Sequence, residues 1–177
     1  MKKHKYGHGY KAIGFIIALL AWDLITKALT DGINLKVIPG FFNFVSVDNT
    51  GGAWGILNQH TWILIVLTFL FLGAYFTFNY FFKQRTLFYT IGFSLVASGT
   101  IGNLFDRLFL GHVRDFISLD FIKFPVFNLA DMFLCVGMIM LAVFFLFLYP
   151  KLNKGILKKN LRLKKSKVLK IFTKGSL

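Results

Sequence analysis

The sequence predicts an α-helical integral membrane protein with four membrane-spanning helices, a small extracytoplasmic β-sheet and both termini in the cytoplasm. Of its 177 residues, 56% are hydrophobic and 18% are aromatic, which is above the apolar share of a soluble domain. Four long apolar stretches each approach the roughly 20 residues that a helix needs to cross about 30 Å of hydrocarbon. The expected spans are residues 12–29, 61–82, 86–105 and 132–150.

The first span lies near the N-terminus, where an apolar run can also be a cleavable signal peptide. Its uncharged part covers residues 12–22, and it continues to about Leu29 if Asp23 and Lys27 lie at a membrane interface. These two charged residues stand where a cleavage site needs small residues, and further spans follow. We therefore predict a retained helix.

The other three spans have clear limits. Residues 61–82 hold no charge, residues 86–105 lie between Arg85 and Asp106, and residues 132–150 lie between Asp131 and Lys151. Each stretch is long enough for one crossing.

The basic residues predict the orientation. Four Lys precede the first span, Lys83 and Arg85 lie between spans two and three, and ten Lys or Arg follow span four, with no acid among them. The positive-inside rule places these three segments in the cytoplasm. We expect one membrane domain over residues 1–150 and a basic cytoplasmic tail over residues 151–177. The tail is expected on anionic lipid headgroups, with nucleic-acid binding as the alternative, so the net charge of +14 requires no nucleic acid.

All seven acidic residues are Asp and fall on the outer side of the predicted topology. Ionisable groups at the edge of a bilayer are costly, which makes them candidates for function. The outer segments also contain a predicted strand, Phe42–Val47, framed by Pro39-Gly40 and a turn over residues 49–52. A second aromatic stretch, residues 116–127, either pairs with this strand or lies along the membrane surface.

Asp115 and Asp131 are the candidate catalytic pair. Asp115 follows the third span by about ten residues and Asp131 precedes the fourth, so a returning loop would bring both carboxyls to the outer edge of the bundle. Two carboxyls in contact share one proton, and such a pair activates water in aspartic peptidases. On sequence alone, the position of Asp131 before Met132 favours a plain N-cap of the fourth helix.

Other polar residues have structural readings. Asp23 and Lys27 are spaced i, i+4 and can pair on one helix face, and Asp106-Arg107 reads as a structural ion pair or a loop-fixing contact. The glycines at 51 and 52 form either a plain turn or a close approach to a ligand. The single cysteine, Cys135, lies in an apolar run and reads as a packing residue, and His60 and His112 lack a metal-ligand pattern.

Four ordered motifs resemble those of the lipoprotein signal peptidase family, also called signal peptidase II, over about residues 20 to 135. The matching residues are Asp23, Thr26 and Lys27; then Asn49, Gly51, Ala53 and Trp54; then Gly102, Asn103, Asp106, Arg107, Gly111, Val113, Asp115 and Phe116; and finally Phe127, Asn128, Ala130 and Asp131. Gly52 stands where many members carry Ala, and the lysine-rich tail after Pro150 is outside the family core.

The resemblance implies a membrane aspartic endopeptidase whose dyad is Asp115 and Asp131, which overturns the reading of Asp131 as a cap. The residues implied to bind substrate or support the site are Asp23, Lys27, Asn49, Gly51, Asn103, Asp106, Arg107, Asn128 and Ala130. The implied substrate is a prolipoprotein, cleaved just before a lipobox cysteine that carries a diacylglyceryl group. The implied enzyme is a monomer of the bacterial cytoplasmic membrane with its site on the outer side, and it needs no metal or other cofactor.

Two other classes of protein remain as alternatives. A small transporter or channel subunit would place acids near mid-span to relay protons, whereas the middles of spans two to four hold none. A structural scaffold would leave the outer carboxyls and Asn residues without a role.

Overall fold

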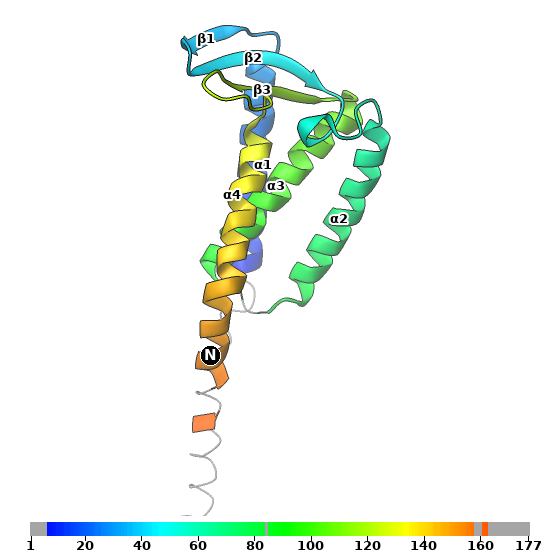
Figure 1. Ribbon diagram of the computed structural model, residues 1–177. Helices are drawn as coiled ribbons and strands as arrows, with labels where there is room; N and C mark the ends of the chain where they lie inside the picture. Colours follow the sequence, from blue (N-terminus) through cyan, green and yellow to red (C-terminus); the bar gives the residue numbers. More distant parts are fainter. Residues whose placement is uncertain (1–6, 84, 158–160, 163–177) are drawn as a thin grey trace, which may run out of the picture. The chain divides into compact units, whose positions relative to one another are not determined.

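The computed structural model describes residues 7–83, 85–157 and 161–162. The chain divides after Met140 into two compact units. The first holds the sheet and most of the apolar helices (Figure 1). The described residues of the second are helical and include a π-helical stretch, Phe144–Leu148.

Four helices are long and apolar enough to cross a membrane, as the sequence predicts. They are α1 (Gly7–Thr30), α2 (Thr61–Phe81), α3 (Leu87–Phe109) and α4 (Leu129–Val143), and the last apolar helical segment extends from Leu129 to Leu157. The side of the membrane on which each terminus lies stays a prediction.

Several helix ends differ from the expected spans, and two of them lie beside the sheet. Helix α3 continues to Phe109 instead of ending at residue 105, and α4 begins at Leu129 instead of residue 132. A prediction from hydropathy ends a span at the first charged residue. The helix itself can continue past that residue where neighbouring groups pair with its charge. Asp106 and Asp131 are therefore helical residues, and each has a fixed place on a helix face.

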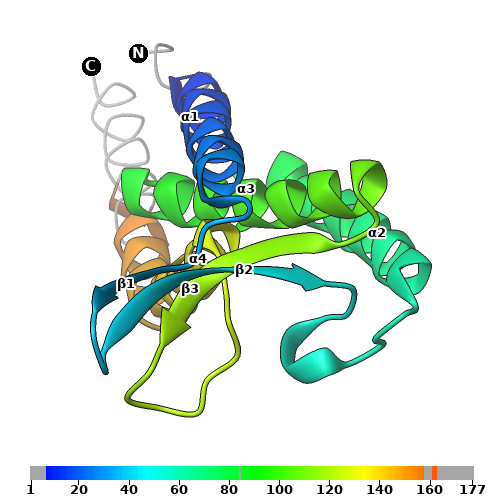
Figure 2. The same cartoon turned by 90° about the horizontal axis from the view of Figure 1, so that it is seen from above.

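The outer segments form the predicted small sheet. Its antiparallel strands are β1 (Leu35–Ile38), β2 (Phe42–Asn49) and β3 (Val113–Leu119), in the order β1-β2-β3. Of the two alternatives left open for residues 116–127, pairing with the first strand holds for residues 116–119, which belong to β3. The sequence did not predict β1. The sheet lies at one end of α1 and α3 (Figures 1 and 2), and its register pairs Asn49 with Val113 and Val47 with Asp115.

Helix α3 carries most of the buried residues among the four helices, including Phe93, Val96 and Ala97. Helix α2 has no buried residue among those that the structure describes, and its apolar side chains are available to lipid. Since lipid is as apolar as these side chains, close helix contact in a membrane depends on small residues. Gly99 of α3 illustrates this, because a Cβ there would collide with the carbonyl oxygen of Ala130 of α4.

Candidate functional site

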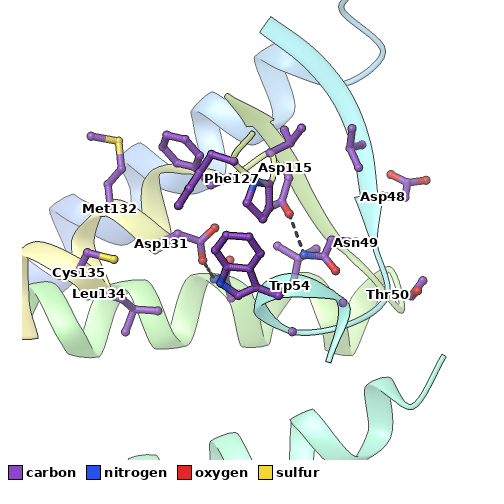
Figure 3. A pocket seen from close by; sticks show the side chains of 18 of the residues that line it. Asp48, Asn49, Thr50, Trp54, Asp115, Phe127, Asp131, Met132, Leu134 and Cys135 are labelled. Atoms are coloured by element: carbon purple, nitrogen blue, oxygen red, sulfur yellow. Dashed lines mark hydrogen bonds between the residues drawn. The ribbon is translucent and has the colours of Figure 1, made fainter. Parts of the chain in front are cut away.

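A cavity of about 990 Å³ opens between the sheet and the ends of α3 and α4 that lie nearest to it (Figure 3). Five of the predicted site residues line it, from four different elements: Asn49 of β2, Asn103 and Arg107 of α3, Asp115 of β3 and Asp131 of α4. The cavity therefore brings together the two carboxyls that the sequence singled out.

Asp131 is held by a reciprocal pair of hydrogen bonds with Asn128. The backbone N–H of Asp131 donates to Asn128 Oδ1 over 3.0 Å, and Asp131 Oδ2 accepts from the backbone N–H of Asn128 over 3.2 Å. This is the capping-box arrangement, with Asn128 in the N-cap place and Asp131 three residues later. The expectation that Asp131 is the N-cap is wrong, because the helix begins at Leu129.

Asp115 accepts hydrogen bonds from two side-chain amides. Asn49 Nδ2 donates to its Oδ2 over 2.9 Å, and Asn128 Nδ2 donates to its Oδ1 over 2.6 Å. Asn128 thus contacts both carboxyl residues, one through its amide nitrogen and the other through its amide oxygen. Because Asn128 is fully buried, this link fixes the two carboxyls relative to each other.

The environment of Asp115 favours its protonated form. Its residue surface is only 3% exposed, and this burial, followed by the negative charge of Asp131, raises the pKa of Asp115 from 3.8 to about 7. The amides of Asn49 and Asn128 and the charge of Lys27 act in the opposite direction. Asp115 can therefore hold a proton near neutral pH.

A cluster of charges is buried directly behind the cavity wall. Lys27 Nζ lies 2.9 Å from Asp23 Oδ2 and 3.5 Å from Asp106 Oδ2, and all three side chains are fully buried. The same ammonium donates to Asn103 Oδ1 over 2.9 Å. The predicted Asp23–Lys27 pair is present, and it belongs to a larger network that reaches the cavity.

Asp106 pairs with Arg114 rather than with its neighbour Arg107. Arg114 Nη2 lies 2.8 Å from Asp106 Oδ1, and the Arg114 backbone N–H donates to Asp106 Oδ2 over 3.1 Å. These hydrogen bonds raise the pKa of Arg114 above its usual value. Of the two readings of Asp106-Arg107, the ion pair is not formed between these two residues, but a loop-fixing contact is present: Arg107 lines the cavity and donates to the Gly51 carbonyl over 2.9 Å.

The remaining predicted residues hold the walls of the cavity. The Ala130 backbone N–H donates to Asp23 Oδ1 over 2.9 Å, which fastens the start of α4 to α1. The Gly51 backbone N–H donates to Asn49 Oδ1 over 2.9 Å, which turns the chain after β2. Ala130 and Gly51 are buried and lie outside the cavity lining.

Several apolar lining residues were not predicted as site residues. On α4 they include Met132, Cys135 and Val136, and on the loop after β3 they include Phe124 and Val126. The expectation that Cys135 packs in the interior is wrong, because it is an exposed free cysteine. Its spacing of four residues from Asp131 places the two side chains on one helix face, and this was the signal that could have identified it.

Trp54 contributes to the same cavity from the loop after β2 (Figure 3). Its side chain is exposed, and its ring meets Phe124 edge to face with centroids 5.8 Å apart. His112 is near the cavity but pairs with Asp48, with His112 Nε2 3.1 Å from Asp48 Oδ1. In the part of the chain that the structure describes, no three His, Cys or acidic side chains form a group that could hold a metal ion.

The model of the signal peptidase (SPase) II family matches residues 15–147 of the chain. The lipoprotein signal peptidase of Clostridium novyi is 39% identical over 130 residues, covering 71% of this chain and 85% of that protein. Its counterpart in Lactobacillus gasseri is 35% identical over 147 residues, covering 80% and 94%. A bacterial membrane enzyme solved by the in meso method is similar in structure, with a TM-score of 0.69 and 33% identity over 77% of this chain and 93% of that one.

Proposed function

The chain belongs to the signal peptidase II family, and from that premise we propose that Asp115 and Asp131 are the catalytic dyad with which it processes prolipoproteins. The family membership makes it a membrane aspartic peptidase and makes the transporter and scaffold alternatives wrong. The observation that carries the dyad is that both carboxyls line one cavity and accept hydrogen bonds from one buried residue, Asn128, Asp115 from its side-chain amide and Asp131 from its backbone N–H.

The proposed reaction uses the two carboxyls in different protonation states. Asp131 takes a proton from a water molecule whose oxygen attacks the scissile carbonyl carbon, while Asp115 gives its proton to the carbonyl oxygen. Collapse of the tetrahedral intermediate then breaks the C–N bond, and the leaving nitrogen takes the proton that Asp131 received. At the same time one hydroxyl of the intermediate returns its proton to Asp115 as the C=O bond re-forms, which regenerates the starting dyad. The raised pKa of Asp115, to about 7, supports its role as the protonated partner. In this mechanism the dyad activates the water, so no metal or other cofactor takes part.

We assign the other polar groups of the site to orientation. Asn49 and Asn128 hold Asp115, and Asn103 donates to Asp131 Oδ1 over 2.8 Å. Arg107 presents a cation to the cavity and can bind a carbonyl oxygen of the substrate backbone. Asp23, Lys27, Asp106, Gly51 and Ala130 support these side chains from behind.

The proposed cleavage position is the bond just before a diacylglyceryl-modified lipobox cysteine. The cavity wall near Asp131 supports this, because Met132, Cys135 and Val136 present an apolar surface that continues along α4. A lipid-tethered substrate can reach such a site from the bilayer and keep its acyl chains out of water, where exposure would cost about 0.8 kcal/mol per CH₂.

We propose that the protein is in the bacterial cytoplasmic membrane with its site on the extracytoplasmic side. The support is the positive charge of the N-terminal segment, of the turn between spans two and three and of the tail, together with the absence of acids from these three segments. All proposed site residues come from one chain, which fits a monomer.

The basic tail is proposed to lie on anionic headgroups and to bind no nucleic acid. Much of it, residues 158–160 and 163–177, is outside the described residues. The division into a membrane domain over residues 1–150 and a tail over residues 151–177 remains a prediction.

The test of the dyad is cleavage of a diacylglyceryl-modified lipobox peptide by detergent-purified protein. Asp115→Asn and Asp131→Asn should each lower kcat by at least about a hundredfold, because each removes one partner of the proton transfer. Asp31→Asn is the matched control, since Asp31 is an exposed acid of the outer segment. Circular dichroism checks the helical content of each variant. Activity within a few fold of the wild type in a folded Asp115 or Asp131 variant would remove that residue from the mechanism.

A further inference from the structure

Lys27 has an unusual setting for a membrane-embedded lysine. Its side chain is fully buried, and it contacts two carboxylates, Asp23 and Asp106, with separations of 2.9 and 3.5 Å. Arg114 pairs with Asp106 on the far side, so the cluster holds two carboxylates and two cations and is neutral. Lys27 nevertheless has a further contact, a 2.9 Å hydrogen bond to Asn103 Oδ1, and this contact points toward the cavity rather than into the charge cluster.

That contact determines which way the Asn103 amide faces. Its oxygen accepts from Lys27 Nζ over 2.9 Å and from Asn128 Nδ2 over 3.2 Å. Both neighbours are donors, so a flipped amide would place an NH₂ group against an ammonium and against another NH₂. The amide nitrogen of Asn103 is therefore held on the opposite side, where it donates to Asp131 Oδ1 over 2.8 Å.

We propose that Lys27 is a positioning residue of the peptidase, which acts through Asn103 to keep a hydrogen-bond donor on Asp131 and so makes Asp131 the carboxyl that is ionised in the resting dyad. The inference rests on the proposed function of Asp115 and Asp131. It assigns Lys27 a role in the chemistry that exceeds pairing with Asp23.

The two carboxyls of the dyad differ in the way this role requires. Asp131 accepts from Asn103, whose amide is polarised by a cation, and from the backbone N–H of Asn128 at the start of α4, where the helix dipole favours negative charge. Asp115 accepts from the neutral amides of Asn49 and Asn128 and is the more buried carboxyl. A shared proton is therefore more stable on Asp115.

The other charged groups that face the dyad are few in the described residues. From α3, Arg107 interacts electrostatically with both Asp115 and Asp131. Its positive charge attracts both carboxylates, so it does not distinguish them by the sign of its effect. From α1 the facing charge is Lys27, and from β3 it is Asp115 itself. The charge of Lys27 also acts on Asp115. Its hydrogen-bond contact through the Asn103 amide, however, ends directly on Asp131, whereas the path to Asp115 passes through Asn128 as well.

The experiment compares two double variants that keep the buried cluster balanced. Lys27→Met with Asp23→Asn removes one positive and one negative charge and leaves Asn103 Oδ1 without its Lys27 donor. Lys27→Gln with Asp23→Asn removes the same charges but keeps an N–H donor for Asn103 Oδ1. Lys11→Met is the control, because Lys11 is an exposed lysine on the same helix. The measurement is the pH profile of kcat and kcat/KM with the lipidated peptide.

We expect the Met double variant to lose at least about tenfold in kcat, with KM changed by less than about twofold. The acid-side limb of its kcat/KM profile should move to higher pH by about half a unit or more. The loss of a donor makes the Asp131 carboxylate less stable, so the dyad binds its second proton at a higher pH. The Gln double variant should recover most of the kcat, since the amide stays oriented. The inference would be overturned if the two double variants had the same kcat and the same pH profile, or if both were folded but inactive.

A measurement on the wild-type protein decides the question if neither double variant folds. With ¹⁵N-labelled Asn, the two Nδ2 protons of Asn103 should respond differently to pH: the proton donated to Asp131 should shift as the dyad titrates, and the other should not. An equal response of the two protons, or no response, would overturn the inference. Failure of the dyad itself is distinguishable, because it would appear as retained cleavage in Asp115→Asn or Asp131→Asn.

Discussion

Asn128 donates to Asp115 over 2.6 Å with its amide nitrogen, while its amide oxygen accepts from the backbone N–H of Asp131 over 3.0 Å. One buried side chain therefore caps helix α4 and also holds Asp115 beside the start of that helix, where Asp131 lies. The N-cap of α4 and the geometry of the site depend on the same residue. Stability and activity should consequently respond to different parts of the Asn128 amide.

Asn128→Asp separates these two roles. The new carboxylate can still cap α4, because it accepts from the backbone N–H of Asp131, so the melting temperature should stay within a few degrees of the wild type. The donor to Asp115 is lost and a negative charge takes its place, so kcat should fall by at least about tenfold. Cleavage assays and thermal unfolding in detergent measure the two effects.

Asn128→Ala is the matched comparison. It removes both the cap and the donor, so it should cost about 1 kcal/mol of stability in addition to the loss of activity. If Asn128→Asp were as active as the wild type, the hydrogen bond to Asp115 would have no part in catalysis.

The raised pKa of Asp115, to about 7, predicts how activity depends on pH. The mechanism needs one proton on the dyad, so kcat/KM should fall about tenfold per pH unit once the pH rises above about 7. The apparent value belongs to the pair, because the two carboxyls titrate together. A profile that stays flat up to pH 9 would contradict the assignment of the proton.

The same shift predicts the pH dependence of folding stability. Between pH 3.8, the ordinary pKa of the carboxyl, and pH 7 the folded protein holds a proton on Asp115 that the unfolded chain has lost, so stability decreases as the pH rises through this window. Above pH 7 both states are ionised and the dependence ends. Asp115→Asn, a neutral isostere, should therefore be more stable than the wild type at pH 8, by up to a few kcal/mol on the order-of-magnitude scale of about 1.4 kcal/mol per pKa unit. Unfolding of both proteins at pH 5 and pH 8 measures this, and an equal difference at the two pH values would count against it.

Cys135 offers a chemical test of where the substrate lies. It is exposed, lines the cavity and is the only cysteine of the chain, so an apolar maleimide modifies one site. The added group would occupy the cavity one helical turn from Asp131, and cleavage of the lipidated peptide should fall by at least about tenfold, as expected for a blocked binding surface. Saturating substrate should slow the labelling.

Cys135→Ala controls for this experiment, because its activity should not change when the reagent is added. Full activity of the wild type after stoichiometric modification would show that the substrate does not use this part of the cavity.

The sequence predicted the parts of the fold that depend on composition along the chain. Uncharged runs located the four spans, and an aromatic, β-branched run located β2. The ends of α3 and α4 were missed because the charges of Asp106 and Asp131 were taken to lie outside the helices, whereas tertiary contacts to Arg114 and Asn103 satisfy them inside.

The sequence predicted those site residues that belong to the four motifs. Asp115 and Asp131 were found, but the partner of Asp106 was misassigned to its sequence neighbour Arg107. The actual partner, Arg114, comes from a strand that packs back on α3, and a single sequence does not reveal such a contact. The apolar lining residue Cys135 was missed because its setting resembles that of any residue in an apolar helix.

Gly102→Ala tests whether contact between helices α1, α3 and α4 positions the dyad. A Cβ at Gly102 would collide with the Asp23 carboxylate, which holds both Lys27 and the Ala130 backbone N–H. An Ala in an unobstructed helix position stabilises relative to Gly by about 1 kcal/mol, but here the collision should destabilise by about 1–3 kcal/mol and lower kcat. Gly73→Ala on α2 is the matched control, because nothing lies within 4 Å of the added carbon, and it should be neutral or stabilising. Thermal unfolding and cleavage rates of the two variants give the comparison. If Gly102→Ala behaved like Gly73→Ala in both measurements, the Asp23 carboxylate would have room to move without disturbing Asp131, and the tight contact between α1 and α3 would have no role in positioning the dyad.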